Sequence, residues 1–115
     1  MQSMTDQEIL TTVTPMVEAM QLGWDENNRD KFIAHGSEQF QQFMTKDEFN
    51  AQRGEIFPQL GKHTSLRLIH LHRYPTNITV LWEMSCTGRP TPVLVIYIFA
   101  ETEQGIVMTA AWPSY

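Results

Sequence analysis

The sequence predicts an α+β domain in which N-terminal helices pack on a curved four-stranded antiparallel sheet. Two observations carry this prediction. Residues 1–60 hold helical apolar spacing and two capping boxes, and residues 61–115 hold short strand patterns separated by turn residues. A length of 115 residues is typical of one domain, so we expect residues 1–115 to fold as a single unit.

The first half is expected to form three helices. Thr5 and Glu8 have the spacing of a capping box, and apolar residues at helical spacing follow them. Pro15 lacks a backbone N–H and is expected to kink or split this first helix. Gly23 is expected to end it, because glycine often follows the last helical residue.

Two further helices are expected before the sheet begins. The second covers residues 28–34, and Ser37 is placed to cap a further short turn after it. Thr45 and Glu48 repeat the capping box and open the third helix, which Pro58 is expected to stop.

The second half is rich in β-branched and aromatic residues, and it predicts four strands at about residues 65–74, 78–86, 93–100 and 106–112. Short connections permit only antiparallel pairing, because a parallel return requires a long crossover. The first strand mixes apolar and polar residues in both phases, which predicts a bulge or bend.

The third strand is apolar on both faces, so both faces are expected to be covered. The helices supply one cover. A second copy of the chain most simply supplies the other, which predicts a homodimer through the outer face of the sheet. A curled sheet, or loops that wrap around it, is the alternative.

Charge and composition exclude several classes of partner. The formal net charge is −5 and the basic residues are scattered, so no nucleic-acid partner is expected. No apolar run approaches the length of a membrane span, so no membrane partner is expected. The first residues lack the pattern of a signal peptide, and the expected location is the cytoplasm.

Several segments together resemble the nuclear transport factor 2-like superfamily, a cystatin-like α+β group that includes ketosteroid isomerase, scytalone dehydratase and the small polyketide cyclases. The segments that carry this resemblance are Met20–Trp24, Arg29–Phe32, Thr45–Phe49, Leu60–Gly61 and Glu103–Ile106. The resemblance implies a cone in which helices and a curved sheet enclose an apolar pocket, and dimers that form through the outer sheet face. It says little about activity, since this scaffold hosts many unrelated functions.

The leading hypothesis is a non-catalytic homodimeric domain whose cone binds a small apolar ligand, or is simply filled by its own side chains. The residues expected around this pocket are large apolar or aromatic side chains and one histidine: Trp24, His70, Trp82, Met84, Tyr97, Met108 and Trp112.

Two other functions are open from the sequence. An isomerase, dehydratase or cyclase-like enzyme would use His70 and Tyr97, the one acid–base pair that we expect inside the pocket. A protein-interaction module would instead use the third strand to bind a different partner.

No metal or cofactor is expected. His70 and His72 lie two apart on a strand and so share a face, but a metal site needs further ligands. The other candidates show no ligand spacing; they are His35, His63, Glu83 and Cys86. We therefore expect both histidines to face solvent or the edge of the core.

Overall fold

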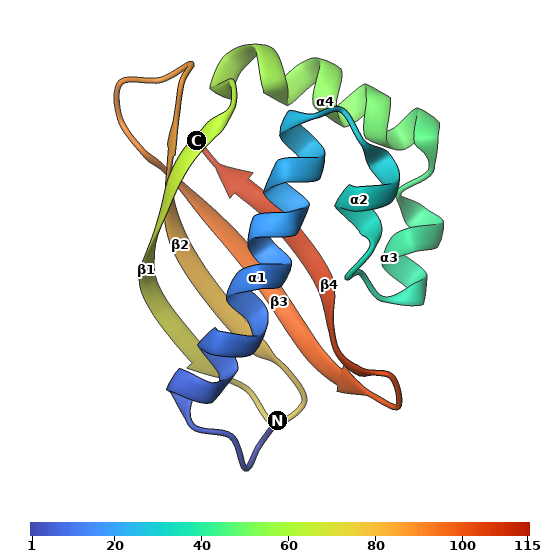
Figure 1. The fold of residues 1–115 in the computed structure, drawn as a ribbon, viewed down its shortest axis with the longest axis vertical. Helices are drawn as coiled ribbons and strands as arrows, with labels where there is room; N and C mark the ends of the chain where they lie inside the picture. The colour runs from blue at the N-terminus through green and yellow to red at the C-terminus, as the bar shows by residue number, and fades with distance from the viewer.

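A computed structural model describes residues 1–115 as an α+β fold with four helices and one four-stranded antiparallel sheet. The helices are α1 (Asp6–Asp25), α2 (Arg29–Ile33), α3 (Glu38–Phe43) and α4 (Lys46–Leu60). The strands are β1 (His63–Arg73), β2 (Ile78–Cys86), β3 (Val93–Thr102) and β4 (Gly105–Ser114). In Figure 1, α1 crosses one face of the sheet, and α2, α3 and α4 lie together toward one end of it.

The core lies between α1 and the face of the sheet turned toward it. Alternate residues of β2 and β3 are buried on this inner face, which is the period-two pattern of a half-covered sheet. They are Ile78, Val80, Trp82, Met84, Cys86, Val93, Val95, Tyr97 and Phe99. The buried stripe of α1 packs with them and consists mainly of Ile9, Val13, Met16, Val17 and Met20.

The structure has four helices, one more than the three predicted. The turn after Ser37 is helix α3, and the Ser37 hydroxyl caps it by accepting the N–H of Phe40 at 3.1 Å. Helix α1 is not split at Pro15, because proline removes only one backbone bond while the buried stripe holds both halves against the sheet. It also continues past Gly23, which instead permits close packing: a Cβ there would lie 2.6 Å from the backbone nitrogen of Phe32.

Helix α4 begins and ends differently from the prediction. The Thr45 hydroxyl accepts the N–H of Glu48 at 3.2 Å, but the Glu48 carboxylate accepts from the side chain of Gln52 and does not complete a capping box. The helix passes through Pro58 and ends at Leu60, and the next residue, Gly61, has a φ of 72° and a ψ of −159° that suit glycine alone.

The strand order β1-β2-β3-β4, with every pair antiparallel, confirms the predicted sheet. The predicted irregularity in the first strand is also confirmed, because the β1–β2 register shifts between Leu68 and His70. The shift leaves Ile69 without a partner and changes the phase of the strand. Leu68 pairs with buried Trp82 on the inner face, whereas His70 pairs with Leu81 on the outer face.

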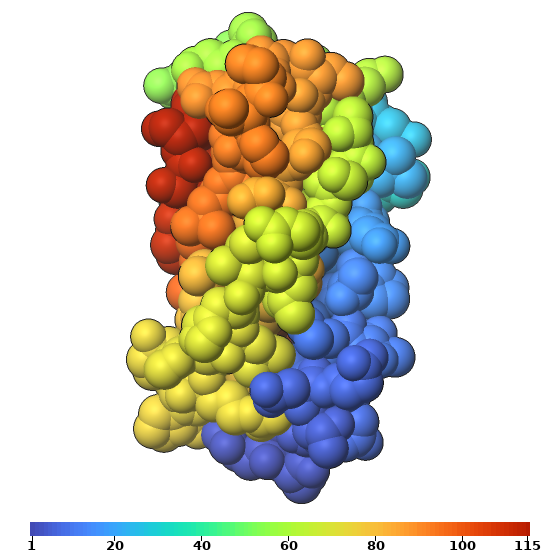
Figure 2. All heavy atoms as spheres, turned by 90° about the vertical axis from the view of Figure 1, so that its left-hand side faces the viewer, coloured from blue at the N-terminus to red at the C-terminus, as the bar shows by residue number.

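The outer face of the sheet is apolar at its centre. The helices lie on the opposite face (Figure 1), and the central outward-facing residues are only partly buried: Leu81, Leu94, Ile96 and Ile98. Strand β1 forms one edge of the sheet and runs exposed across the view in Figure 2. None of the four helices has the length and apolar character to cross a bilayer.

Candidate functional site

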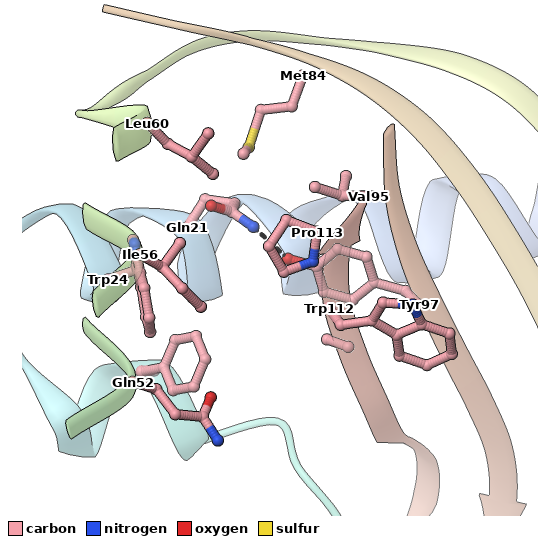
Figure 3. Close-up of a pocket in the computed structure, with 12 residues that line it drawn as sticks. Gln21, Trp24, Gln52, Ile56, Leu60, Met84, Val95, Tyr97, Trp112 and Pro113 are labelled. Carbon is pink, nitrogen blue, oxygen red and sulfur yellow. Dashed lines mark hydrogen bonds between the residues drawn. The ribbon is translucent and has the colours of Figure 1, made fainter. Parts of the chain in front are cut away.

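A small apolar pocket opens between α1, α4 and the sheet, and Figure 3 shows its lining side chains. Its volume is about 60 Å³, and it is partly open to solvent. Nine of its 12 lining residues are hydrophobic, so the few polar groups among the others set its chemistry. The lining residues are Gln21, Trp24, Phe32, Gln52, Ile56, Leu60, Met84, Val95, Tyr97, Ala111, Trp112 and Pro113.

A buried polar pair forms one side of this pocket. The side-chain amide of Gln21 on α1 donates to the hydroxyl of Tyr97 on β3, with 2.5 Å between nitrogen and oxygen. Both residues are almost completely buried, at 8% and 2% exposure. Figure 3 shows the two side chains meeting across the gap between the helix and the sheet. The pair therefore joins the two layers of the fold at the pocket.

The Tyr97 hydroxyl stays protonated. Burial raises its pKa far above the ordinary tyrosine value, and the hydrogen bond from Gln21 lowers it only in part. The hydroxyl accepts the Gln21 N–H, so its own proton remains free to be donated. If the amide were turned over, Tyr97 would donate and Gln21 would keep two free N–H groups. Either orientation leaves a hydrogen-bond donor for a bound molecule.

An aromatic cluster supports the other side of the pocket. Trp24 contacts Phe32 and Phe49, with ring centroids 5.3 and 5.6 Å apart. The Trp24 backbone is held as well, because the Arg53 guanidinium donates to its carbonyl oxygen at 2.7 Å. The indole is thus held by packing and by its backbone.

The lining contains no ionisable group apart from Tyr97. Its other polar residues are Gln21 and Gln52, and the Gln52 amide donates to the carboxylate of Glu48 at 3.0 Å. A charged ligand would lose its hydration here without gaining a counter-charge. The pocket thus suits a neutral molecule.

The structure brings together four of the seven residues expected at the pocket: Trp24, Met84, Tyr97 and Trp112. Trp112 belongs to the pocket wall only through its position on β4: it pairs with Ile96, so its side chain projects from the outer face of the sheet and is 47% exposed. Trp82 and Met108 do not line the pocket but are buried in the core, with Trp82 packed edge-on against Tyr97 at 5.6 Å. They therefore follow the alternative considered above, in which aromatic and methionine side chains fill the cone.

The predicted pair of His70 and Tyr97 does not form. Because of the bulge in β1, His70 lies exposed on the outer face, whereas Tyr97 is buried on the inner face. The sheet itself separates the two side chains, so they cannot act on one bound molecule. The hypothesis of an isomerase, dehydratase or cyclase-like enzyme that uses His70 and Tyr97 together is therefore not supported by their positions.

Gln21 is the pocket residue that the sequence reasoning missed. It follows Val17 by four residues, so it falls on the apolar stripe of α1. A polar residue at a position predicted to be buried needs a hydrogen-bond partner, and this was the available signal. The partner, Tyr97, lies 76 residues away in the sequence and could not be identified from spacing.

A second polar cluster lies where α1 ends and β1 begins. The Asp25 carboxylate binds His63, with 2.5 Å between Oδ2 and Nδ1. His63 pairs across the sheet with Cys86, which is buried. Burial raises the pKa of the Cys86 thiol, the Asp25 charge raises it further, and Arg89 lowers it in part. The thiol is therefore held in its protonated, weakly nucleophilic form.

No known family model matches this chain, and no curated protein matches it in sequence. Among solved structures, the chain is similar to that of Bd1075 from Bdellovibrio bacteriovorus, with a TM-score of 0.53 and 8% sequence identity. The similarity covers 90% of this chain and 39% of that one, so the chain spans well under half of that protein. At this identity the likeness concerns the fold alone.

Proposed function

We propose that this chain is a non-catalytic binding domain whose pocket takes a small, neutral, largely apolar molecule that carries one oxygen acceptor. The observation that carries the proposal is the Gln21–Tyr97 pair, a buried hydrogen-bonding unit with a free donor in an otherwise apolar lining. Pockets with apolar walls and few convergent polar groups are the usual form of small-molecule sites. A ketone, ester or ether oxygen would accept the free proton.

The size of the pocket limits the ligand. A volume of about 60 Å³ is well below the roughly 300 Å³ at which drug-sized ligand pockets begin. A ligand therefore inserts a small ring or short chain beside Met84 and Val95, and the rest of a larger molecule extends through the open side.

A matched pair of probes tests the proposal. Cyclopentanone and methylenecyclopentane have the same shape, but only the ketone carries an acceptor oxygen. Binding is followed through the methyl NMR signal of Met84 in protein labelled at methionine methyl groups. We expect both probes to shift this signal, and the ketone to bind about fivefold more tightly, since a neutral hydrogen bond contributes about 1 kcal/mol. The chain that carries both Gln21→Met and Tyr97→Phe is expected to lose that preference, because no donor of the pair remains.

The control for the pocket is a pair of alanine substitutions. Ala111→Leu adds bulk to the lining, whereas Ala51→Leu adds the same bulk at an exposed position of α4. Only the first should abolish the Met84 shift. If neither probe moves Met84 in the unaltered protein, the pocket does not bind small apolar molecules and the proposal is wrong.

We further propose that two copies associate through the outer face of the sheet. The support is the partly buried centre of that face, where Leu81, Ile96 and Ile98 would meet their counterparts. Strands β2, β3 and β4, spaced about 4.8 Å apart and about ten residues long, span about 500 Å² per copy, or about 1,000 Å² for the pair, and this interface leaves the edge strand β1 uncovered. That is close to the minimum for a specific interface.

Sedimentation velocity tests the association. The unaltered chain is expected to sediment as a dimer, and Ile96→Lys as a folded monomer, because a buried ammonium group without a partner disrupts an apolar interface. Leu22→Lys is the control, since Leu22 is exposed on α1 at the other side of the molecule. A monomer at high concentration would show that the outer face does not pair with itself.

We also propose that the fold is the cone of the nuclear transport factor 2-like superfamily. An antiparallel meander with a long N-terminal helix across one face supports this assignment. The register shifts in β1 and β4 add support, because bulges bend strands and curve a sheet. A crystal structure would test it: a flat sheet with no enclosed inner face would contradict the assignment.

A further inference from the structure

We propose that His70 and His72 form a binding site for one borderline divalent transition-metal ion, Zn²⁺ or Cu²⁺, on the outer face of β1. The two imidazoles supply two ligands, and water completes the coordination. This site lies on the opposite face of the sheet from the apolar pocket, and the inference does not depend on the function proposed for that pocket.

The bulge in β1 creates the arrangement. After the register shift, His70 pairs with Leu81 and His72 with Thr79, so both histidines project from the outer face of the sheet. Both side chains are exposed, and β1 is an edge strand that is open along its length in Figure 2. A hydrated ion can therefore reach both rings without any movement of the backbone.

The separation of the rings fits shared coordination. Their centroids are 5.8 Å apart and their planes are tilted by 38°. Zinc–nitrogen bonds of about 2.1 Å place two ligating imidazole centroids between about 4.5 Å (bonds at right angles) and about 6.5 Å (bonds opposed). The observed separation lies within this range, so small side-chain rotations bring one nitrogen of each ring onto the ion.

The surroundings leave both rings available. Neither histidine makes a hydrogen bond or an ion pair with another protein group, and the one further ring contact is that of His72, which packs edge-on against Tyr74 at 4.6 Å. The two arginines of this strand are engaged elsewhere: Arg67 pairs with Glu83 at 3.2 Å, and Arg73 binds Asp6 at 2.7 Å. The chain also carries a formal net charge of −5, which favours a cation.

The ligand chemistry sets the type of ion. Neutral imidazole nitrogen suits zinc, copper and nickel, whereas magnesium and calcium require oxygen ligands. No group of three His, Cys, Asp or Glu side chains is placed to hold a metal in this chain. The site is therefore a two-ligand chelate, which we expect to bind Cu²⁺ more tightly than Zn²⁺ because Cu²⁺ stands higher in the usual affinity order.

Titration of the intact chain with ZnCl₂ tests the site, with uptake measured by calorimetry and ligation by the ring-proton NMR signals of the four histidines. The titration is run at about pH 7.5, where free imidazole is neutral. We expect one ion per chain and selective broadening or shift of the His70 and His72 signals. MgCl₂ should produce neither effect.

Substitutions separate this site from nonspecific uptake. His70→Ala and His72→Ala should each weaken Zn²⁺ binding by about tenfold or more, because even outer-shell partners of a metal contribute that much. His35→Ala is the matched control, since His35 is exposed and far from β1 in the sequence, and it should leave binding unchanged. All three positions are exposed, so circular dichroism and urea midpoints should match those of the unaltered chain.

Three results would overturn the inference. The first is no saturable uptake below about 1 mM Zn²⁺. The second is unchanged binding in the chain that carries both His70→Ala and His72→Ala. The third is one ion per two chains, which would mean that a second copy, and not water, completes the coordination.

Discussion

The hydrogen bond between Gln21 and Tyr97 should stabilise the fold, and removing either partner alone should lower the free energy of unfolding. Tyr97→Phe keeps the ring but removes the oxygen that accepts the Gln21 amide. The amide is then left in a site where Gln21 is only 8% exposed. Leaving a buried donor without a partner costs about 1–3 kcal/mol. Because the pocket is partly open and admits water, we expect about 1–2 kcal/mol.

A double-mutant cycle separates the pair from its surroundings. Gln21→Met, which keeps the length of the side chain, should lower the free energy of unfolding by a similar amount, because it leaves the Tyr97 hydroxyl without its partner. The doubly substituted chain replaces both polar groups with apolar ones and should cost less than the sum of the single changes. The coupling free energy is thus expected to be about 1 kcal/mol or more.

Urea unfolding followed by tryptophan fluorescence measures each free energy of unfolding, and the midpoint of thermal unfolding should fall by about 4 °C per kcal/mol. Tyr74→Phe is the control: Tyr74 is 47% exposed, and its loss of a hydroxyl should change stability by less than about 0.5 kcal/mol. The reasoning is refuted if Tyr97→Phe behaves like this control, or if the cycle is additive.

Three further predictions concern single positions. Gly54→Ala should stabilise the chain by about 1 kcal/mol in urea unfolding, because Gly54 lies inside α4 and an added Cβ meets nothing within 4 Å. Gly61→Ala should destabilise it by more than about 1 kcal/mol in the same assay, since φ is 72° and the new Cβ would lie 2.8 Å from the Gly88 nitrogen; an unchanged midpoint would contradict this. Cys86 should react with iodoacetamide more slowly in the folded chain than in urea at the same pH, because burial raises the pKa of its thiol; equal rates, measured by mass spectrometry, would count against it.

The order of the elements and their broad class could be read from the sequence because the signals are local. The capping residues Thr5, Ser37 and Thr45 each stand directly before a helix. The strict alternation of residues 78–86 gave a strand with the predicted bounds. Errors came from proline and glycine. Pro15 and Pro58 lie inside helices, because packing against other elements outweighs the loss of one backbone bond.

The candidate site was only partly predictable. Trp24 and Met84 could be expected at the pocket because each lies on the apolar face of its own element. The side on which His70 lies could not be derived, since it depends on where the bulge falls in the register between β1 and β2. A shift of one residue moves every later side chain of a strand to the opposite face, and pairing with the neighbouring strand decides that shift.

The sequence by itself determined that four strands follow a helical half, that the strands pair antiparallel, and that the side chains of residues 78–86 alternate between two faces. These follow from periodicity and short connections, which act within a few residues. Only the tertiary structure decided that Gln21 meets Tyr97, that the volume left between the helices and the sheet is small, and that His70 and His72 stand together on the outer face. Those features join segments distant in the sequence, and packing, not local preference, sets the distances between them.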